Sequence, residues 1–306
     1  QRTISDRIIS KRQLRKFIKH VKNKPTNNNV LVVEANPHHG EVLPAAIKYF
    51  RDMGYDVDLI VRPEVYKDKP FIRYSNPPKI FCIAAQYLKD FFKSDLFDKY
   101  KFVYFSSAHI FIHLFEGSVF DLIGGCPPRY LFMEHSLTRH AEFGKPEYEP
   151  HMVSMAGLDR FPMFNPNYFG EIKITPLSNK THFVACARTF NEGDIIYAAV
   201  RDLLSRGITD FHVTIAGRSS VRKIPSDIKK YVSKTGMLGF NDLWKLYEKA
   251  DYFFNPLEPQ IESHRKYLNE VTSGYWQAIM AFGKVPISHS AFAPVYRYSD
   301  DNAVLY

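Results

Sequence analysis

The run Val30-Leu31-Val32-Val33, followed by Asn36-Pro37-His38-His39-Gly40, decides the fold of the first half of this chain. Four apolar and mostly β-branched residues predict a buried parallel strand, and the glycine-containing segment after them predicts a loop. Residues 42–50 then place their apolar side chains on one helical face, and residues 57–61 predict the next strand. Strand, loop, helix and strand within about thirty residues form a βαβ unit.

The same alternation continues along the chain and then starts again. Apolar runs bounded by turn residues predict further strands at 80–83, 102–105 and 130–133. Proline and glycine between 162 and 179 predict a linker, after which strands are expected at 182–187, 211–217, 252–254 and 285–287, and helices at 194–205, 243–249 and 273–282. The sequence therefore predicts an α/β protein with two Rossmann-like doubly wound domains facing a cleft. We expect a basic N-terminal arm over 1–28, a first domain over 29–170 and a second over 171–306.

The composition restricts the class of protein. The chain has 306 residues, 45% hydrophobic, which excludes a disordered chain or a small disulfide scaffold. Its net charge is +9, but residues 1–24 carry nine basic side chains against one acidic one, so the remainder is nearly neutral. In that basic helical arm, Leu14, Phe17, Ile18 and Val21 share one face, which is typical of a helix lying on an anionic membrane surface. A helix that packs on the protein explains the pattern equally well.

The spacing of the cysteines and the length of the apolar runs indicate the cellular compartment of the protein. Cys82, Cys126 and Cys186 are widely spaced, so neither a disulfide framework nor a zinc module is indicated. No apolar run reaches the ~20 residues that a spanning helix needs. We expect a cytoplasmic protein, either soluble or peripheral at the inner face of a membrane. The sequence lacks an initiator Met and an apolar leader, as in a trimmed chain.

Four segments of the second half carry short motifs in a fixed order. They are Val184-Ala185-Cys186-Ala187-Arg188-Thr189-Phe190-Asn191-Glu192-Gly193, Leu238-Gly239-Phe240 with Ala250-Asp251, Asn255-Pro256, and Thr272-Ser273-Gly274 with Gly283-Lys284-Val285-Pro286-Ile287. Together they resemble the donor-binding domain of GT-B glycosyltransferases, whereas the first half resembles that family only in outline. The resemblance implies a metal-independent enzyme without a cofactor. Such an enzyme moves a sugar from a nucleoside diphosphate sugar to a hydroxyl of a glycan or glycolipid, as in surface polysaccharide or glycoconjugate synthesis.

The resemblance assigns the donor site to residues that follow strands or begin helices. A helix start offers unpaired N–H groups to phosphates, and a guanidinium can hold a diphosphate. The expected diphosphate residues are Arg188, Thr272, Ser273, Gly274, Arg265 and Lys266, and the expected base pocket contains Gly217, Leu238 and Gly239. The family loop carries a second cation where this chain has Glu192, so Arg265 or Lys266 is expected to supply that charge.

Histidines and carboxylates after the strands of the first half are the candidate acceptor-side catalysts. His39 and Glu41 follow the first strand, and His135 follows the strand at 130–133. A base must lie within hydrogen-bond reach of the acceptor hydroxyl, and imidazole is suited to this proton transfer. In the second half, Glu270 is the carboxylate that the resemblance places at the donor sugar. Glu262 is as compatible with a solvated charge on a loop as with a role in the donor site.

Other functions are compatible with the same fold. A polyol-phosphate transferase and a nucleotide-sugar epimerase are alternatives, and a nucleic-acid-binding module with a vestigial cleft is another. The aromatic residues lack the basic interleaving of nucleic-acid platforms, which argues against a nucleic-acid partner. Asp56-Val57-Asp58 has the D-x-D form of a metal site, but it begins a predicted strand, so we expect no metal there.

Overall fold

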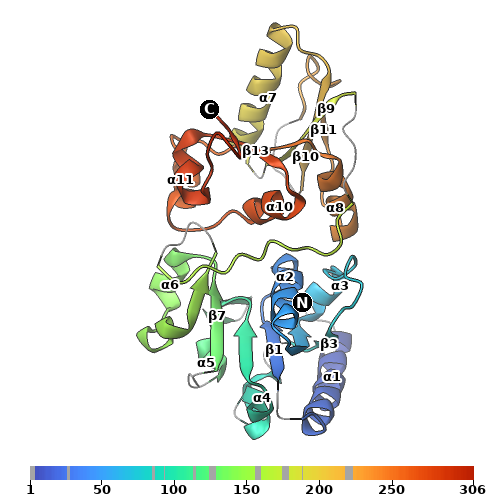
Figure 1. The fold of residues 1–306 in the computed structure, drawn as a ribbon, viewed down its shortest axis with the longest axis vertical. Helices are drawn as coiled ribbons and strands as arrows, with labels where there is room; N and C mark the ends of the chain where they lie inside the picture. Colours follow the sequence, from blue (N-terminus) through green and yellow to red (C-terminus); the bar gives the residue numbers. More distant parts are fainter. Residues whose placement is uncertain are drawn as a thin grey trace. The chain divides into compact units, whose positions relative to one another are not determined.

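The computed structural model describes residues 4–25, 28–84, 87–92, 94–112, 115–123, 129–155, 160–173, 179–187, 189–217 and 223–306. The chain divides into two compact units (Figure 1). The first contains residues 1–170 and 270–272, and the second contains 171–269 and 273–306. Each unit is built on a six-stranded parallel sheet.

The first sheet has the strand order β3-β2-β1-β4-β7-β8. Its strands are β1 (Asn29–Glu34), β2 (Asp56–Val61), β3 (Lys79–Cys82), β4 (Phe102–Phe105), β7 (Tyr130–Glu134) and β8 (Met152–Ser154). The order reverses between β1 and β4, which is where ligands bind in open α/β sheets. Val33 marks this point in the register, because it lies between Ile60 of β2 and Phe105 of β4.

Helices cover both faces of the first sheet. They are α1 (Ile4–Lys22), α2 (Leu43–Asp52), α3 (Pro63–Lys67), α4 (Lys89–Phe92), α5 (Phe120–Ile123) and α6 (Leu137–Phe143), with a hairpin of β5 (His109–Ile112) and β6 (Phe115–Ser118). Successive side chains of β1 pack on opposite faces of the sheet, because side chains alternate between the two faces along a strand. Leu31 and Val33 pack in the core that contains Phe17 of α1, and Val30 and Val32 pack in the core that contains Leu43 of α2.

Helix α1 is an integral part of the first unit, and it lies beside β3 (Figure 1). Phe17 and Val21 are completely buried, and the Phe17 ring packs on Phe81 with centroids 4.8 Å apart. The expectation that this apolar face lies on a membrane is therefore wrong, because the face fills the protein core instead. An amphipathic pattern shows only that one face of the helix is shielded from solvent, and in this structure the sheet covers that face.

The acidic pair at the start of β2 anchors α1. Lys24 lies 2.9 Å from Asp56 and 2.7 Å from Asp58, and Asp58 also accepts a 2.7 Å hydrogen bond from the hydroxyl of Tyr100. The Nε2 atom of His20 lies 3.0 Å from the same carboxylate. The D-x-D segment thus joins the end of α1 to the sheet, chiefly through the buried ion pair of Lys24 with Asp58.

The second sheet repeats the topology of the first, with the order β11-β10-β9-β12-β13-β14. Its strands are β9 (Thr181–Cys186), β10 (Phe211–Ala216), β11 (Val232–Lys234), β12 (Tyr252–Asn255), β13 (Val285–Ser288) and β14 (Val304–Leu305). Its helices are α7 (Phe190–Ser205), α8 (Phe240–Lys249), α9 (Glu262–Arg265), α10 (Gly274–Phe282) and α11 (Ala293–Tyr296). The predicted class, α/β with two Rossmann-like doubly wound sheets, is confirmed. Among the described residues, no helix has both the length and the apolar content to cross a bilayer.

Candidate active site

A buried carboxyl group lies at the point where the first sheet reverses its order. Glu34 ends β1, and its side chain accepts hydrogen bonds from Ser106 Oγ at 2.7 Å, Ser107 Oγ at 2.8 Å and the backbone N–H of Asn36 at 2.6 Å. Burial raises the pKa of Glu34 to about 7, although the nearby His39 and these hydrogen bonds act in the opposite direction. The carboxyl edge of the first sheet therefore holds a group that titrates near neutrality.

Two of the predicted catalytic histidines are stacked above this edge. His39 has a left-handed backbone with φ 66°, and its ring stacks on His135 with centroids 4.6 Å apart. His135 Nε2 lies 2.6 Å from the carbonyl oxygen of Ser106. Because a carbonyl only accepts, Nε2 carries the proton, and Nδ1 of the neutral ring is left as an acceptor. Burial and the charge of His39 lower the pKa of His135 to about 4.

Glu41, the third predicted residue, lies against His39. The distance from His39 Nδ1 to Glu41 Oε1 is 3.6 Å, and both side chains are partly exposed. Burial would raise the pKa of Glu41, but the adjacent His39 outweighs it, so the pKa is lowered. A carboxylate beside one ring nitrogen favours the proton there, which leaves the other nitrogen able to accept one. The structure thus brings His39, Glu41 and His135 into one group.

A second cluster of ionisable groups, which the sequence did not predict, lies behind His135. Glu134 is completely buried, and its Oε2 lies 2.7 Å from His109 Nε2 and 3.3 Å from His140 Nδ1. Burial would raise the pKa of Glu134, but its hydrogen bonds with the two histidines lower it to about 2. The hydrogen bond to Glu134 raises the pKa of His140, and Glu149 adds to this from 3.2 Å on the other side of the ring. Glu134 also accepts a 2.8 Å hydrogen bond from Ser136 N–H, so the cluster fixes the turn that contains His135.

His109, Glu134 and His140 are also residue types that bind divalent ions, and their ligand atoms lie within 4.8 Å of one another. In the present arrangement the 2.7 Å contact between His109 and Glu134 is a direct hydrogen bond. An ion could bind to all three only if this hydrogen bond opened. The cluster is therefore a buried network of ion pairs and hydrogen bonds.

Glu270 joins the candidate group from a distant part of the sequence. Residues 270–272 belong to the first unit. The backbone carbonyl of Glu270 accepts a 2.8 Å hydrogen bond from Leu137 N–H, and its carboxylate accepts one of 2.9 Å from Thr138 Oγ1. Both donors lie at the start of α6, two and three residues after His135, so this exposed carboxylate lies beside the same turn.

The predicted diphosphate residues include an open helix start in the second unit. Ser273 is the N-cap of α10, and its side chain makes no capping hydrogen bond to the helix. Gly274 is exposed, and a Cβ added there would meet no atom within 4 Å. The first N–H groups of a helix carry partial positive charge and bind anions. The open backbone at Gly274 therefore has the geometry expected of a phosphate site, whereas the N–H of Ser273 already donates a 3.3 Å hydrogen bond to the hydroxyl of Tyr296. Thr272 precedes them in the segment that belongs to the first unit.

The predicted base-pocket residues lie at the same edge of the second sheet. Gly217 follows β10 with φ 97°, and Gly239 is the N-cap of α8, preceded by the partly buried Leu238. Strands of a parallel sheet end where the connecting helices begin, so these residues share the edge with the start of α10. Neither glycine has an atom within 4 Å of an added Cβ, so the backbone is open to a ligand at both positions.

The structure does not assign the three predicted cationic side chains to the diphosphate site. Arg188 lies outside the described residues. Arg265 and Lys266 are exposed, with the Arg265 side chain 3.0 Å from the carbonyl of Pro259 and the Lys266 ammonium over the Tyr267 ring. No contact in the described residues assigns either of them to a diphosphate.

The structure gives Glu192 a role of its own. Its side chain accepts a hydrogen bond from the backbone of Thr189, while Thr189 accepts one from Glu192 N–H, which is a capping box at the start of α7. Glu192 also lies 3.5 Å from the buried His264. At the position of the family's cation, this chain therefore has a carboxylate that caps a helix.

Comparisons with known proteins identify the fold. No family model and no curated protein matches the chain. A solved alpha-glucosyltransferase, in complex with UDP and a 13-mer DNA containing an A:G mismatch, matches 90% of this chain and 83% of its own, with 13% identity and a TM-score of 0.54. E. coli ADP-heptose heptosyltransferase II covers 91% and 90% at 8% identity, with a TM-score of 0.48. Anabaena HepE, in complex with UDP and glucose, covers 91% and 85% at 11% identity, with a TM-score of 0.47. The chain has the GT-B fold, as the sequence predicts.

Proposed function

We propose that this chain, which has the fold of GT-B glycosyltransferases, transfers a sugar from a nucleoside diphosphate sugar to a hydroxyl of a glycan or glycolipid. The observation that carries the proposal is the convergence of His39, Glu41, His135 and Glu270 on one turn region of the first unit. A donor with a nucleoside diphosphate is supported by the solved alpha-glucosyltransferase of the same fold, which is bound to UDP.

His39 is the proposed general base. Glu41 orients its Nδ1 proton, so Nε2 accepts the proton of the acceptor hydroxyl as that oxygen attacks the sugar. His135 is the proposed sugar-binding residue, because its ring is neutral and its Nδ1 accepts a hydrogen bond from a sugar hydroxyl. Glu270 lies close to the same turn and is the proposed carboxylate at the donor sugar.

The start of α10 is the proposed site of the leaving diphosphate. Backbone N–H groups of the first turn of α10, beginning with Gly274, stabilise the charge that develops as the bond to the sugar breaks. Gly217, Leu238 and Gly239 are the proposed contacts of the base. In this proposal the reaction needs neither a metal nor a cofactor, and the protein works in surface polysaccharide or glycoconjugate synthesis, in the cytoplasm and peripheral to a membrane.

Donor binding tests the proposal. Full-length protein is titrated by calorimetry with a panel of UDP, ADP, GDP and dTDP hexoses. Gly274→Ala should bind the donor roughly tenfold more weakly, because the added methyl occupies the space where the phosphate approaches. Ser205→Ala, at the exposed end of α7 in the same unit, is the control and should bind the donor like the natural chain.

Turnover then distinguishes the enzyme classes. With the donor that binds, mass spectrometry of the acceptor should show an added sugar, and His39→Asn should lower kcat by about 10²–10⁴-fold. An added polyol phosphate would identify the alternative transferase, and a changed donor without a changed acceptor would identify an epimerase. Failure of every nucleotide sugar to bind, with DNA binding that weakens steeply with salt, would replace the enzyme with a nucleic-acid module.

A further inference from the structure

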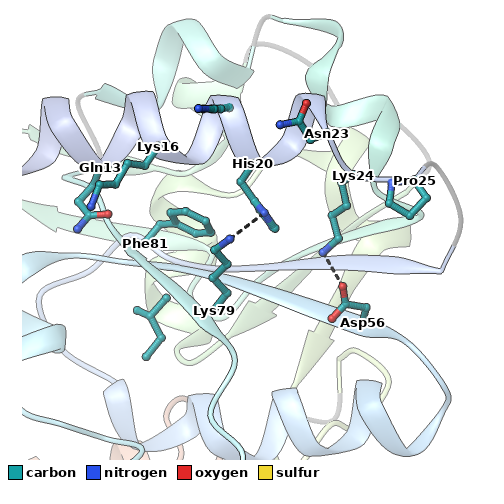
Figure 2. Close-up of a pocket in the computed structure, with 11 residues that line it drawn as sticks. Gln13, Lys16, His20, Asn23, Lys24, Pro25, Asp56, Lys79 and Phe81 are labelled. Carbon is teal, nitrogen blue, oxygen red and sulfur yellow. Dashed lines mark hydrogen bonds and ion pairs between the residues drawn. The ribbon is translucent and has the colours of Figure 1, made fainter.

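A second site lies at the other edge of the first sheet, between α1 and the first residues of β3 (Figure 2). The cavity has a volume of about 740 Å³. Its lining includes Gln13, Lys16, Lys19, Asn23, Lys79 and Phe81. Asp56 begins β2 and Lys79 begins β3, so the pocket lies at the amino ends of the strands, opposite to the carboxyl edge that holds His39 and His135.

The acidic groups near this pocket are already occupied. Lys24 is only 5% exposed and pairs with both Asp56 and Asp58. His20 Nε2 contacts Asp58 at 3.0 Å. The pocket therefore has no acidic group in its lining other than one already bound to a lysine.

Lys79 has an unusual partner. Its ammonium lies 3.0 Å from Nδ1 of His20, which Figure 2 shows as a direct contact across the pocket. An ammonium only donates, so Nδ1 accepts from Lys79, and Nε2–H of His20 donates to Asp58. An imidazole can orient the Lys79 ammonium but does not neutralise its charge.

Lys16 and Lys19 add two more cations. Both are exposed, and within the described residues neither pairs with a carboxylate. Gln13 and Asn23 line the same pocket with amide groups, and Phe81 forms an apolar part of its wall. Other cations of the exposed face of α1, Lys11, Arg12, Arg15 and Lys22, increase the positive potential around it.

We propose that this pocket binds a phosphate group, held by Lys16, Lys19 and Lys79. Three ammonium groups and two amides suit a compact anion with several acceptor oxygens. The phosphate belongs either to a lipid headgroup or to a soluble phosphorylated molecule, and both present the same chemistry to the three lysines. This site is separate from the proposed donor site and does not depend on the proposed function.

The test compares two triple variants of the full chain. Lys16→Gln/Lys19→Gln/Lys79→Gln removes the three cations, and Lys223→Gln/Lys229→Gln/Lys230→Gln removes the same charge from exposed positions of the second unit. The soluble probes are inorganic phosphate and glycerol phosphate, measured by calorimetry. The lipid probes are phosphatidylcholine vesicles with and without phosphatidylglycerol, measured by co-sedimentation.

The expected result is that the pocket variant binds at least one probe roughly tenfold more weakly, whereas the control variant binds like the natural chain. Soluble binding identifies a free phosphorylated ligand, and binding only to phosphatidylglycerol vesicles identifies a headgroup. UDP binding should be unchanged in the pocket variant, which separates this site from the donor site. Equal weakening in both variants, or no binding of any probe, would overturn the proposal.

His20 supplies a local measurement on the natural chain, which is needed if the pocket variant does not fold. Phosphate that draws Lys79 away from Nδ1 should shift the His20 ring resonances in NMR spectra. His182, in β9 of the second unit, is the control histidine and should not shift. Unchanged His20 resonances at saturating phosphate and in the presence of phosphatidylglycerol micelles would also overturn the proposal.

Discussion

The rings of His39 and His135 stack with their centroids 4.6 Å apart and their planes inclined by 27°. They reach this position from different strand ends of the first sheet, and each has a different hydrogen-bonding partner. His39 lies beside the carboxylate of Glu41, and His135 donates to the carbonyl of Ser106. Two rings in contact cannot both be charged without repulsion, so each charge disfavours the other.

Replacing His39 should change the titration of its neighbour. In His39→Ala the pKa of His135 should rise from about 4, because the charge of His39 is one of the two causes that lower it, after burial. NMR titration of the His135 ring measures the shift. The control is His289→Ala in the second unit, which should leave His135 unchanged. A pKa of His135 that stays constant in His39→Ala would show that burial alone lowers it.

Glu34→Gln should stabilise the protein in alkaline solution. The pKa of Glu34 is about 7 in the folded chain and 4.5 as the reference, so the folded state binds the proton more tightly. The natural chain should therefore lose stability as pH rises from about 4.5 to about 7, by up to about 3 kcal/mol, and glutamine removes this loss. Urea unfolding at pH 5 and pH 8 measures it. A variant that is no more stable than the natural chain at pH 8 would contradict the prediction.

Glu134→Gln should destabilise the protein by about 3 kcal/mol, because the buried His140 loses one of its two carboxylate partners and keeps only the more exposed Glu149. The lowered pKa of Glu134 gives stability above pH 4.5 that is lost as pH falls toward 2. The raised pKa of His140 gives stability below pH 6.5 that is lost as pH rises through its folded value. The difference between variant and natural chain, measured by urea unfolding, should therefore be largest between pH 4.5 and 6.5. A difference that does not change with pH would indicate a packing effect.

Phe17→Ala should destabilise the first unit by about 3–5 kcal/mol, because the ring is completely buried between α1 and the sheet. Lys22→Ala on the exposed end of the same helix should change stability by less than about 0.5 kcal/mol. Thermal unfolding followed by circular dichroism measures both. If α1 were an independent arm, the two variants would unfold at the same temperature.

The strands that the sequence predicted are those with continuous apolar runs, such as Val30 to Val33. The strands β8, β11 and β14 were not predicted, because segments of two or three residues show no usable period. The apolar face of α1 was predicted, but its environment was not, since a core and a membrane select the same residues.

The candidate site was predicted where single residues follow strand ends. His39, Glu41 and His135 were found in this way, and the structure shows them in contact. His109 and His140 were missed because only the tertiary fold brings them to Glu134. The capping role of Glu192 has a signal in the sequence, since Thr189 and Glu192 have the spacing of a capping box.

The packing of α1 has a consequence for synthesis on the ribosome. Phe17 packs on Phe81, Phe91 and Tyr100, so α1 is made before partners that are translated much later. At about 5–20 residues per second, Tyr100 follows Phe17 by roughly 4 to 17 s. During that interval the apolar face of a strongly cationic helix has no native cover. The nascent chain is therefore most exposed to chaperones, and to any anionic surface nearby, before its first sheet is complete.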